Sequence, residues 1–333
     1  MNAPIDRRLS VAPMMDWTDR HCRYFLRQIS QHTLLYTEMI TTGALLYGDR
    51  NRFLQFDAAE HPIAIQLGGS DPTDLATCAK MAEDYGYDEV NLNVGCPSDR
   101  VQSGAFGLCL MNHPQLVANC VHAMKTAVKI PVTVKTRLGV DDNDSDEALH
   151  AFVALLQQAG VDHVCIHARK GWLKGLSPKE NRDVPPLQYE RAYQLKQAFP
   201  TLNIGINGGI ETLEQTQHHL QHLDAVMIGR AAYHDSYLLA GADQAIFGGD
   251  MPIQSREQII ERMLPYIERE MANGAALKHI VRHMLNLFKS CPGAKHWRRH
   301  LSTHAHLPNA SIGLIHEALV LMQDAAPDDD TTA

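Results

Sequence analysis

Short apolar runs recur along the first two-thirds of the chain and alternate with amphipathic segments. Apolar residues at three- and four-residue spacing predict helices at 71–85, 113–128, 145–159, 187–199 and 211–220. The apolar runs, rich in Val, Ile and Leu, predict eight strands at 9–15, 34–40, 63–67, 90–94, 132–138, 163–167, 203–206 and 225–228. Strand and helix alternating eight times over about 240 residues predicts an α/β fold, the (β/α)₈ TIM barrel. An open, doubly wound sheet is the alternative.

The strand pattern ends at the Gly248-Gly249 pair, and only helical periodicity follows. From Gln254 onward, apolar residues recur with the spacing of amphipathic helices, which predicts a small helical bundle. We therefore expect a barrel domain at 1–242 and a helical domain at 243–324. The last segment, 325–333, is acidic with small residues, and we expect it to be disordered.

Composition narrows the class of protein. The chain has 333 residues, of which 45% are hydrophobic and 20% charged, and it contains no apolar run of about eighteen residues that could span a membrane. Its first eight residues lack the apolar core of a signal peptide. Seven cysteines without a Cys-x-x-Cys pair indicate reduced thiols rather than disulfides or structural zinc. We expect a cytoplasmic protein with no bound metal.

Charge is unevenly distributed along the chain. The formal net charge is −8, yet residues 271–316 contain no Asp or Glu. Six basic residues lie in that segment: Lys278, Arg282, Lys289, Lys295, Arg298 and Arg299. The helical domain is therefore expected to be locally cationic, which favours a nucleic-acid partner in spite of the overall negative charge.

A cysteine directly follows one of the predicted strands. In 90–98, apolar residues alternate with Asn91 and Asn93 before the chain reaches Cys96 and Pro97. The alternation predicts a strand with one buried apolar face, and the proline ends its hydrogen-bond ladder. The Cys96 thiol is therefore expected at the carboxyl end of a strand, where barrel enzymes carry their catalytic residues. A buried structural cysteine is the alternative.

Polar residues also follow the neighbouring predicted strands. In a barrel, residues at the carboxyl ends of the strands surround one cavity. Any one of them alone could be an ordinary hydrogen-bonded strand end, but such residues on six successive strands favour a site. They are Gln66, Asn93, Lys135, Arg137, His167, Arg169, Asn207, Gly208, Gly209, Gly229 and Arg230.

The glycines of this set favour a phosphate site. Bare backbone N–H groups at 208–209 and at Gly229 could cradle a phosphate, with Arg230 adding positive charge. Tight turns without a ligand are the alternative. The last two strands of a barrel are the usual place for such a phosphate.

The remaining side chains fit a flavin mononucleotide (FMN). Gln66 could hydrogen-bond the pyrimidine edge of the isoalloxazine, and Lys135 could stabilise the electron-rich reduced ring. Met14 and Met15, at the end of the first predicted strand, would pack against the ring, unless they are simple core residues. The set therefore predicts a flavin enzyme.

These motifs together resemble the tRNA-dihydrouridine synthase family, and within it the DusA-type branch. The resemblance covers essentially the whole chain. The Cys-Pro-Ser motif at 96–98 is specific for the family, and the insertion at 171–182 is specific for the branch. The other matching segments are 12–20, 93–95, 207–210 and 228–230.

The resemblance implies an enzyme that uses FMN, with NADPH as electron donor, to reduce uridines 20 and 20a in the D-loop of tRNA. It also implies that Cys96 is the general acid, which protonates carbon 5 of the uracil after hydride transfer to carbon 6. The residues implied to hold FMN are Pro13, Met14, Met15, Gln66, Lys135, His167, Asn207, Gly208, Gly209, Gly229 and Arg230.

A base buried in folded tRNA must be extracted, which requires compensating contacts to the RNA. Asn93 is expected to hold the uracil carbonyl. Lys179 and Arg182 in the insertion, with Lys295 and Arg298 in the helical domain, are the other expected tRNA contacts. We expect a monomer, because no long apolar face is left over.

Some residues invite other readings. His296, His300 and His304 are spaced along one predicted helix face, but no carboxylate or thiol joins them there, so we expect an RNA-facing surface rather than a metal site. Cys109 and Cys165 have apolar neighbours and are expected to be packing residues.

Two other functions remain open. An FMN-dependent oxidoreductase of the dihydropyrimidine or dihydroorotate type, acting on free pyrimidines, would share the barrel and the cofactor but needs no basic helical domain. An RNA-binding protein with a degenerate barrel would be colourless, because it would hold no flavin.

Overall fold

The computed structural model describes residues 5–98 and 104–324. They form two compact units. The first, which we call the barrel unit, comprises residues up to 18 together with 32–229. The second, the helical unit, comprises 19–31 and the chain from 230 onward. Its bounds differ from those of the predicted helical domain at 243–324, because residues 19–31 and 230–242 also belong to it. The predicted acidic tail at 325–333 lies outside the described residues.

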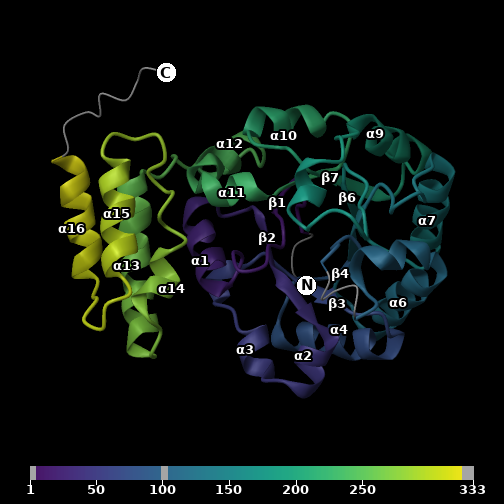
Figure 1. Cartoon of the computed structure of the whole chain (residues 1–333), viewed down its shortest axis with the longest axis horizontal. Helices are drawn as coiled ribbons and strands as arrows, with labels where there is room; N and C mark the ends of the chain where they lie inside the picture. The colour runs from purple at the N-terminus through teal and green to yellow at the C-terminus, as the bar shows by residue number, and fades with distance from the viewer. Residues whose placement is uncertain (1–4, 99–103, 325–333) are drawn as a thin grey trace. The chain divides into compact units, whose positions relative to one another are not determined.

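Eight strands close the barrel unit into a ring (Figure 1). Each strand pairs in parallel with the next, and β8 pairs with β1. This confirms the predicted (β/α)₈ barrel, and the open sheet is wrong. The strands are β1 (Leu9–Val11), β2 (Leu34–Thr41), β3 (Ile63–Gly68), β4 (Glu89–Asn93), β5 (Val132–Arg137), β6 (His163–His167), β7 (Asn203–Asn207) and β8 (Ala225–Ile228).

The first strand is shorter than predicted. It ends at Val11 rather than at residue 15. Pro13 has no N–H for a ladder, and beyond it the chain turns, because the carbonyl of Met14 accepts hydrogen bonds from the N–H groups of Trp17 and Thr18 at 3.1 and 3.0 Å. The two methionines therefore lie in a loop after the strand.

Helices surround the ring of strands (Figure 1). Asp71 and Ser145 cap α4 and α7 by accepting backbone N–H groups, as their type and position predict. All five predicted helices are present. The helical segments of the barrel unit are α2 (Thr42–Tyr47), α3 (Arg50–Leu54), η1 (Ala58–Glu60), α4 (Pro72–Tyr85), η2 (Gly107–Asn112), α6 (Pro114–Ala127), α7 (Asp146–Gln158), α8 (Glu180–Asp183), α9 (Tyr189–Ala198) and α10 (Leu213–His219).

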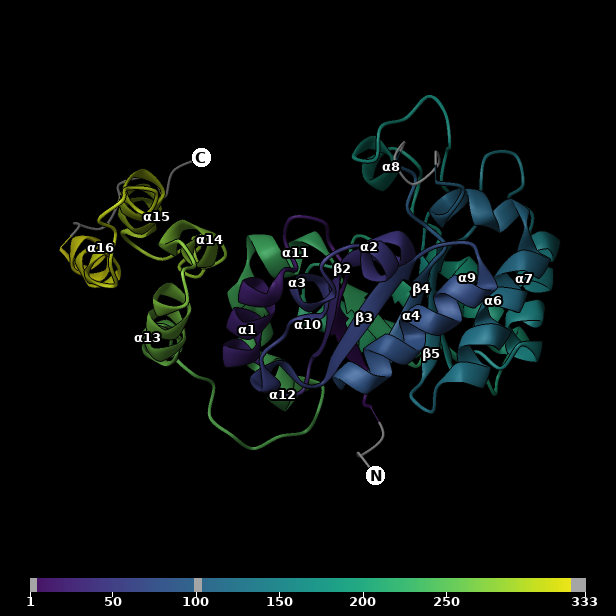
Figure 2. The ribbon, with the colours of Figure 1, turned by 90° about the horizontal axis from the view of Figure 1, so that it is seen from below.

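The insertion after β6 carries α8 and extends beyond the ring of barrel helices (Figure 2). Asn181 holds it together, since its side chain accepts the N–H of Trp172 and donates to the carbonyls of Trp172, Leu176 and Ser177. Asn181 is fully buried. A single asparagine therefore organises a segment that has little regular structure.

Alternation along the strands decides what faces the barrel interior. Val90, Leu92 and Val94 are completely buried on one face of the sheet. On the other face, strand register pairs polar residues across neighbouring strands: Gln66 lies beside Asn91, Asn93 beside Lys135, Arg137 beside His167 and His167 beside Asn207. Because the side chains of one strand alternate between faces, these polar side chains share one face of the sheet.

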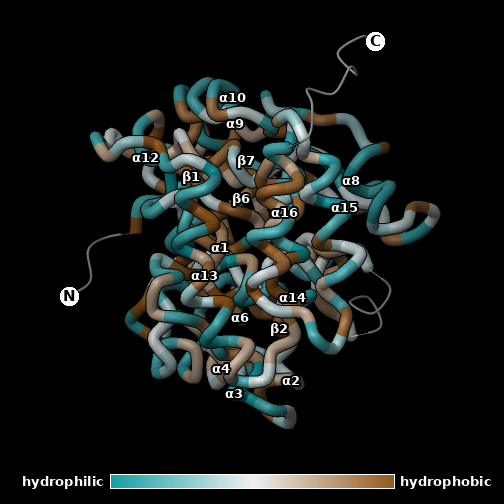
Figure 3. Tube along the Cα trace, turned by 90° about the vertical axis from the view of Figure 1, so that its left-hand side faces the viewer, coloured by the Kyte–Doolittle hydropathy of each residue, from teal (hydrophilic) through white to brown (hydrophobic). Residues whose placement is uncertain are grey.

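The helical unit consists of short and medium helices around its own core. Trp297 and Phe288 are buried in it with their rings edge to face at 5.0 Å. Brown and teal stretches alternate along the trace of α16, as expected for an amphipathic helix (Figure 3). The segments are α1 (Arg20–Ile29), α11 (Arg230–His234), η3 (Ser236–Gly241), α12 (Ala242–Ala245), α13 (Arg256–Ala272), α14 (Leu277–Val281), α15 (Ala294–His304) and α16 (Gly313–Gln323).

Helix α1 belongs to the helical unit although its sequence lies between β1 and β2. Its N-cap, Asp19, accepts the N–H groups of His21 and Cys22 and also lies 3.0 Å from Nε2 of His283. Burial opposes the charge of Asp19, but the contacts with His283 outweigh it, so that the pKa of this carboxyl lies below its usual value. The same residue thus starts one helix and ties it to the segment after α14.

Within the described residues, no helix is both long and apolar enough to cross a bilayer.

Candidate active site

Cys96 lies in the loop that leaves β4. The Asn93 side-chain oxygen accepts the backbone N–H groups of Gly95 and Cys96 at 3.2 and 3.0 Å, and the carbonyl of Cys96 accepts the N–H of Leu108 at 2.9 Å. The thiol is partly exposed, with its Sγ 3.6 Å from Oγ of Ser98. The end of a strand and three hydrogen bonds therefore hold an accessible thiol in a defined place.

Two further amides lie next to this loop. Nδ2 of Asn93 donates to Oε1 of Gln66 at 2.8 Å, and Nε2 of Gln66 donates to Oδ1 of Asn91 at 2.8 Å. All three side chains are buried, with Asn93 the most exposed at 8%. The structure thus brings Gln66, Asn93 and Cys96 together, as the sequence predicts for adjacent strand ends.

Lys135 and His167 are the titratable groups on the next strands. Burial lowers the pKa of Lys135. The interaction with Cys165 raises this pKa, and the charge of Arg137 lowers it again. Among the described residues, Nζ of Lys135 takes part in no hydrogen bond or ion pair. Burial, followed by the charges of Arg137 and Lys135, holds the pKa of His167 well below its usual value. His167 is therefore a neutral imidazole at pH 7, beside a lysine that has no acidic partner.

Arg137 links the cysteine loop to the insertion. Its Nε donates to the carbonyl of Gly95 at 2.9 Å, and its Nη1 donates to the carbonyls of Lys170 and Asn181 at 3.1 and 3.0 Å. Burial lowers the pKa of Arg137 to about 10. The sequence indicates this residue only as one more polar strand end, whereas the structure shows that it holds two loops by their backbones.

The turn after β7 requires its glycines. Gly208 and Gly209 have φ values of 114° and 69°, in the left-handed region. A Cβ at Gly208 would lie 2.8 Å from Cδ2 of His167, and one at Gly209 would lie 2.6 Å from Cδ1 of Leu187. Tyr189 fixes the turn by donating to the carbonyl of Gly208 at 2.8 Å. The backbone here approaches its neighbours more closely than any side chain would allow.

The end of β8 is more open. A Cβ at Gly229 would find its nearest neighbour, Nδ2 of Asn207, only at 3.8 Å. Asn207 is buried and donates to the carbonyl of Met227 at 2.7 Å. Arg230 follows Gly229 directly as the first residue of α11, and it belongs to the helical unit.

The loop after β1 supplies the predicted methionines. Pro13 is partly buried, and the N–H of Met14 donates to Oγ1 of Thr18 at 2.9 Å. Met14 packs against a cluster of buried residues that includes Tyr36 and Cys165. Met15, in contrast, is 56% exposed. The pair is therefore divided, with one methionine packed and the other accessible.

The predicted tRNA contacts are distributed over both units. Lys179 and Arg182 are exposed at α8 of the barrel unit, and Lys295 and Arg298 are exposed on α15 of the helical unit. Their side chains are thus accessible to a large partner.

Two expectations about other residues can be checked. Cys165 is buried, and burial raises the pKa of its thiol to about 11, as fits a packing residue, whereas Cys109 is partly exposed. A carboxylate from another helix reaches the histidines of α15, since Oε2 of Glu317 on α16 lies 3.1 Å from Nε2 of His300. This contact joins α15 to α16, so the spacing of residues along a single helix does not indicate it. No group of three or more metal-ligating side chains is found within the described chain.

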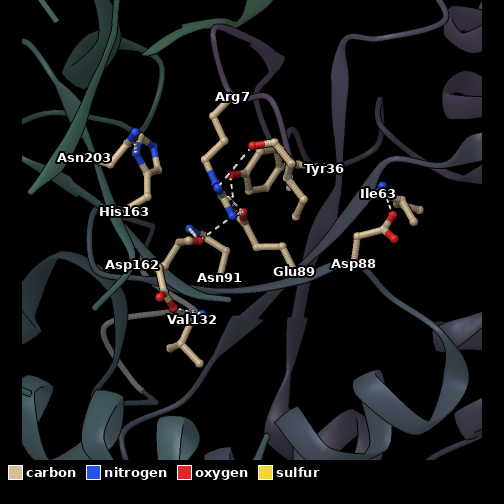
Figure 4. Close-up of polar contacts among 12 residues, drawn as sticks. Arg7, Tyr36, Ile63, Asp88, Glu89, Asn91, Val132, Asp162, His163 and Asn203 are labelled. Carbon is tan, nitrogen blue, oxygen red and sulfur yellow. Dashed lines mark hydrogen bonds and ion pairs between the residues drawn. The ribbon is translucent and has the colours of Figure 1, made fainter. Parts of the chain in front are cut away.

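A buried ion pair that the sequence does not predict lies at the amino end of the strands. Glu89, the first residue of β4, is fully buried. Its Oε2 accepts Nε of Arg7 at 2.7 Å, and its Oε1 accepts the hydroxyls of Tyr36 and Thr133, each at 2.6 Å (Figure 4). The only signal in the sequence is a glutamate directly before the predicted strand at 90–94, and its partner lies 82 residues away.

Comparison with solved structures supports the class of fold. The chain superposes on a 2-naphthoyl-CoA reductase with a TM-score of 0.57 at 12% identity, covering 71% of this chain and 50% of that one. It superposes on an old yellow enzyme homologue from Zymomonas mobilis with a TM-score of 0.52 at 14% identity, covering 76% and 92%. Similarity at this level concerns the barrel fold alone.

Sequence comparison defines the family. The dihydrouridine synthase (Dus) model matches residues 10–322, so the chain belongs to the dihydrouridine synthase family. The chain is 62% identical over 313 residues to the tRNA-dihydrouridine(20/20a) synthase of Vibrio vulnificus (strain CMCP6), covering 94% of this chain and 96% of that one. It is 57% identical over 318 residues to the enzyme of the same name from Escherichia coli (strain K12), covering 95% and 92%. The family and the enzyme class predicted from the motifs are thereby confirmed.

Proposed function

We propose that the protein reduces uridines 20 and 20a in the D-loop of tRNA to 5,6-dihydrouridine. The observation that carries the proposal is the accessible Cys96 thiol, held at the end of β4 beside the amides of Gln66 and Asn93 in a member of the dihydrouridine synthase family. Relatives with about 60% identity over nearly the whole chain are named for this activity, which supports the same positions in tRNA.

The residues present fit FMN as the cofactor. The turn at Gly208 and Gly209 can offer backbone N–H groups to a phosphate, and the open backbone at Gly229 leaves room beside it. Lys135 lacks an acidic partner among the described residues, so its amino group is available to an electron-rich ring. When bound, FMN supplies the two reducing electrons, and we propose NADPH as their source.

The other proposed cofactor residues add shape and hydrogen bonds. Met14 offers a packed thioether and Met15 an accessible one, next to Pro13. His167, neutral at pH 7, can donate or accept a hydrogen bond without adding charge. Asn207 joins the carboxyl ends of β7 and β8 by its hydrogen bond to the carbonyl of Met227, and Arg230 would add positive charge for the phosphate.

Cys96 acts as the general acid in this proposal. Reduction of a carbon–carbon double bond requires a proton at carbon 5 of the uracil, and a thiol within reach of that carbon can donate it. Asn93 orients the base, because its side chain retains one N–H that can donate to a uracil carbonyl. The backbone N–H groups that bind Asn93 keep the thiol and this amide at a fixed separation.

The tRNA contacts are proposed to come from exposed basic side chains. Lys179 and Arg182 flank the barrel in the insertion, and Lys295 and Arg298 lie on α15 of the proposed helical tRNA-binding domain at 243–324. Phosphate contacts of this kind supply binding free energy that offsets the cost of extracting the base. A monomeric, cytoplasmic enzyme is part of the same proposal.

The proposal can be tested by mapping dihydrouridine in tRNA. Cells with and without the gene are compared, and the deletion is complemented with the wild-type gene or with the Cys96→Ala variant. We expect dihydrouridine at positions 20 and 20a to disappear on deletion and to return only with the wild-type gene. Unchanged dihydrouridine in the deletion strain, or turnover of free uracil or orotate by the purified protein at the rate seen with tRNA, would contradict the proposal.

A further inference from the structure

A continuous chain of side-chain hydrogen bonds runs through the barrel unit, from the cysteine loop to the buried ion pair. Each donor along it points toward the same end. It begins at the cysteine loop, where the N–H of Cys96 donates to Oδ1 of Asn93 at 3.0 Å and Nδ2 of Asn93 donates to Oε1 of Gln66 at 2.8 Å. Nε2 of Gln66 then donates to Oδ1 of Asn91 at 2.8 Å. Finally, Nδ2 of Asn91 donates to Oγ1 of Thr133 at 2.9 Å, and this hydroxyl donates to Oε1 of Glu89 at 2.6 Å.

The two ends fix the direction of this chain. Glu89, paired with Arg7, is a carboxylate and can only accept hydrogen bonds. The backbone N–H groups of Gly95 and Cys96 at the other end can only donate. A side-chain amide can in principle rotate by 180° and exchange its oxygen and nitrogen. Here a reversed amide anywhere in the chain would set two donors or two acceptors against each other.

Burial makes such a mismatch costly. Asn91, Thr133 and Glu89 are completely buried, and Gln66 is 1% exposed. A buried polar group without a partner loses its hydrogen bond to water and gains none in return. Aligned hydrogen bonds also polarise one another, so the whole chain favours one orientation.

The fixed direction determines what the site offers to a ligand. An amide nitrogen carries two hydrogens, and the chain uses one from Asn93 and one from Gln66. One N–H therefore remains on each, together with a lone pair on the Gln66 oxygen. Gln66 thus offers one donor and one acceptor, which match a carbonyl and the N–H of a pyrimidine-2,4-dione edge, and Asn93 offers one donor for a carbonyl of a second such edge. Uracil and the isoalloxazine ring share this dione edge.

We propose that Asn91 and Thr133 are positioning residues that transmit the orientation set by the Arg7–Glu89 ion pair to the amides of Gln66 and Asn93. Neither residue needs to touch a ligand. They select dione-bearing ligands by keeping an N–H of each amide available. The inference deepens the proposed function and rests on it, since it assumes that these two amides face the cofactor and the base.

Substitutions at Thr133 test the inference through cofactor affinity. Thr133→Val keeps the shape of the side chain but removes the hydroxyl that joins Asn91 to Glu89, whereas Thr133→Ser keeps the hydroxyl. Thr216→Val, in α10, is the matched control, because Thr216 is equally buried and its hydroxyl donates only to the carbonyl of Thr212. Each apoprotein is titrated with FMN, and fluorescence quenching gives the dissociation constant.

We expect Thr133→Val to bind FMN about tenfold more weakly, because the fraction of molecules with a correctly oriented Gln66 falls. The visible absorption of its bound FMN should also shift, since the hydrogen bond from Gln66 to the ring changes. Thr133→Ser should remain within about twofold of wild type, and Thr216→Val should be unchanged. A folded Thr133→Val protein with wild-type affinity and spectrum would overturn the inference.

A second measurement does not depend on any variant. Neutron diffraction from crystals of the wild-type protein distinguishes the nitrogen from the oxygen of each amide. Asn93 Oδ1 facing the N–H of Cys96, and Gln66 Nε2 facing Asn91, would support the inference, and either amide reversed would overturn it. A wild-type protein that binds no FMN would contradict the proposed function, while the neutron structure would still decide the orientation of the chain.

Discussion

Two adjacent arginines make ion pairs of equal length in different surroundings. Nη2 of Arg7 lies 2.6 Å from Oε2 of Glu89, with side-chain exposures of 14% and 0%. Nη2 of Arg8 lies 2.6 Å from Oδ2 of Asp6, with exposures of 45% and 41%. Replacing each arginine in turn by methionine removes the charge and keeps an unbranched apolar stem. The two variants therefore compare one interaction at two degrees of burial.

The expected losses of unfolding free energy differ severalfold. Among the described residues, Arg7→Met leaves the buried Glu89 carboxylate with only the Tyr36 and Thr133 hydroxyls, and removing one partner of a buried ion pair costs about 3–5 kcal/mol. Arg8→Met removes a pair that water already screens, which is worth at most about 1 kcal/mol. For a unit of this size, about 2–4 °C of melting temperature corresponds to each kcal/mol. The midpoint should therefore fall by roughly 6–20 °C for Arg7→Met and by no more than about 4 °C for Arg8→Met.

Calorimetry at low and high salt measures both effects. The loss in Arg8→Met should vanish between about 0.05 and 0.5 M salt, because exposed charges are screened, whereas the loss in Arg7→Met should persist. Equal shifts of the two variants, or a loss in Arg7→Met that disappears with salt, would refute the reasoning that burial decides the strength of this pair.

Three further predictions concern the thiol, the basic helix and a buried histidine. Cys96→Ala should bind FMN and tRNA normally but slow oxidation of the reduced flavin by tRNA at least about 100-fold in stopped-flow absorbance, and a wild-type rate would exclude Cys96 as the acid. Arg298→Glu should weaken tRNA binding and flatten its salt dependence without changing NADPH oxidation. Lys129→Glu, at an exposed lysine in the segment after α6, should not; equal effects of both would argue against a specific contact. Burial, followed by the charge of Arg7, lowers the pKa of His163 to about 4, so the unfolded chain takes up a proton first as the pH falls from about 6.5 to 4. This histidine alone should account for about 3 kcal/mol of stability lost across that window in urea titrations, in addition to the loss from other buried histidines such as His167. The total loss should therefore be about 3 kcal/mol smaller in His163→Gln and unchanged in His222→Gln, at an exposed histidine; an unchanged pH profile in His163→Gln would contradict the assignment.

Local patterns in the sequence were sufficient for the architecture and the family. An apolar run predicts a strand of the closed barrel. Apolar residues at three- and four-residue spacing, with capping residues such as Asp71 and Ser145, predict a helix. Both signals depend only on residues within one turn or one strand. The position of Cys96 after β4 follows from the same local pattern. The motif containing it and the match over 10–322 agree on the family.

The interior hydrogen-bond chain was decided only by tertiary structure. Nothing near Glu89 in the sequence indicates that Arg7 would be its partner, or that Thr133 would connect it to Asn91. These contacts depend on which strands are neighbours and on their register, and a shift of one residue would turn every side chain to the other face.

The same holds for the loops and helices around the site. In the sequence, Arg137 is one polar residue at a strand end among several. Only the folded chain places the carbonyls of Gly95 and Asn181 within hydrogen-bond distance of its guanidinium group. The position of α1 in the sequence, between β1 and β2, suggests a barrel helix. Its N-cap Asp19 instead contacts His283, far along the chain. The sequence by itself thus determined which elements form and to which family the chain belongs. The closed barrel decided their partners, because partners distant in sequence are chosen by packing and register rather than by local pattern.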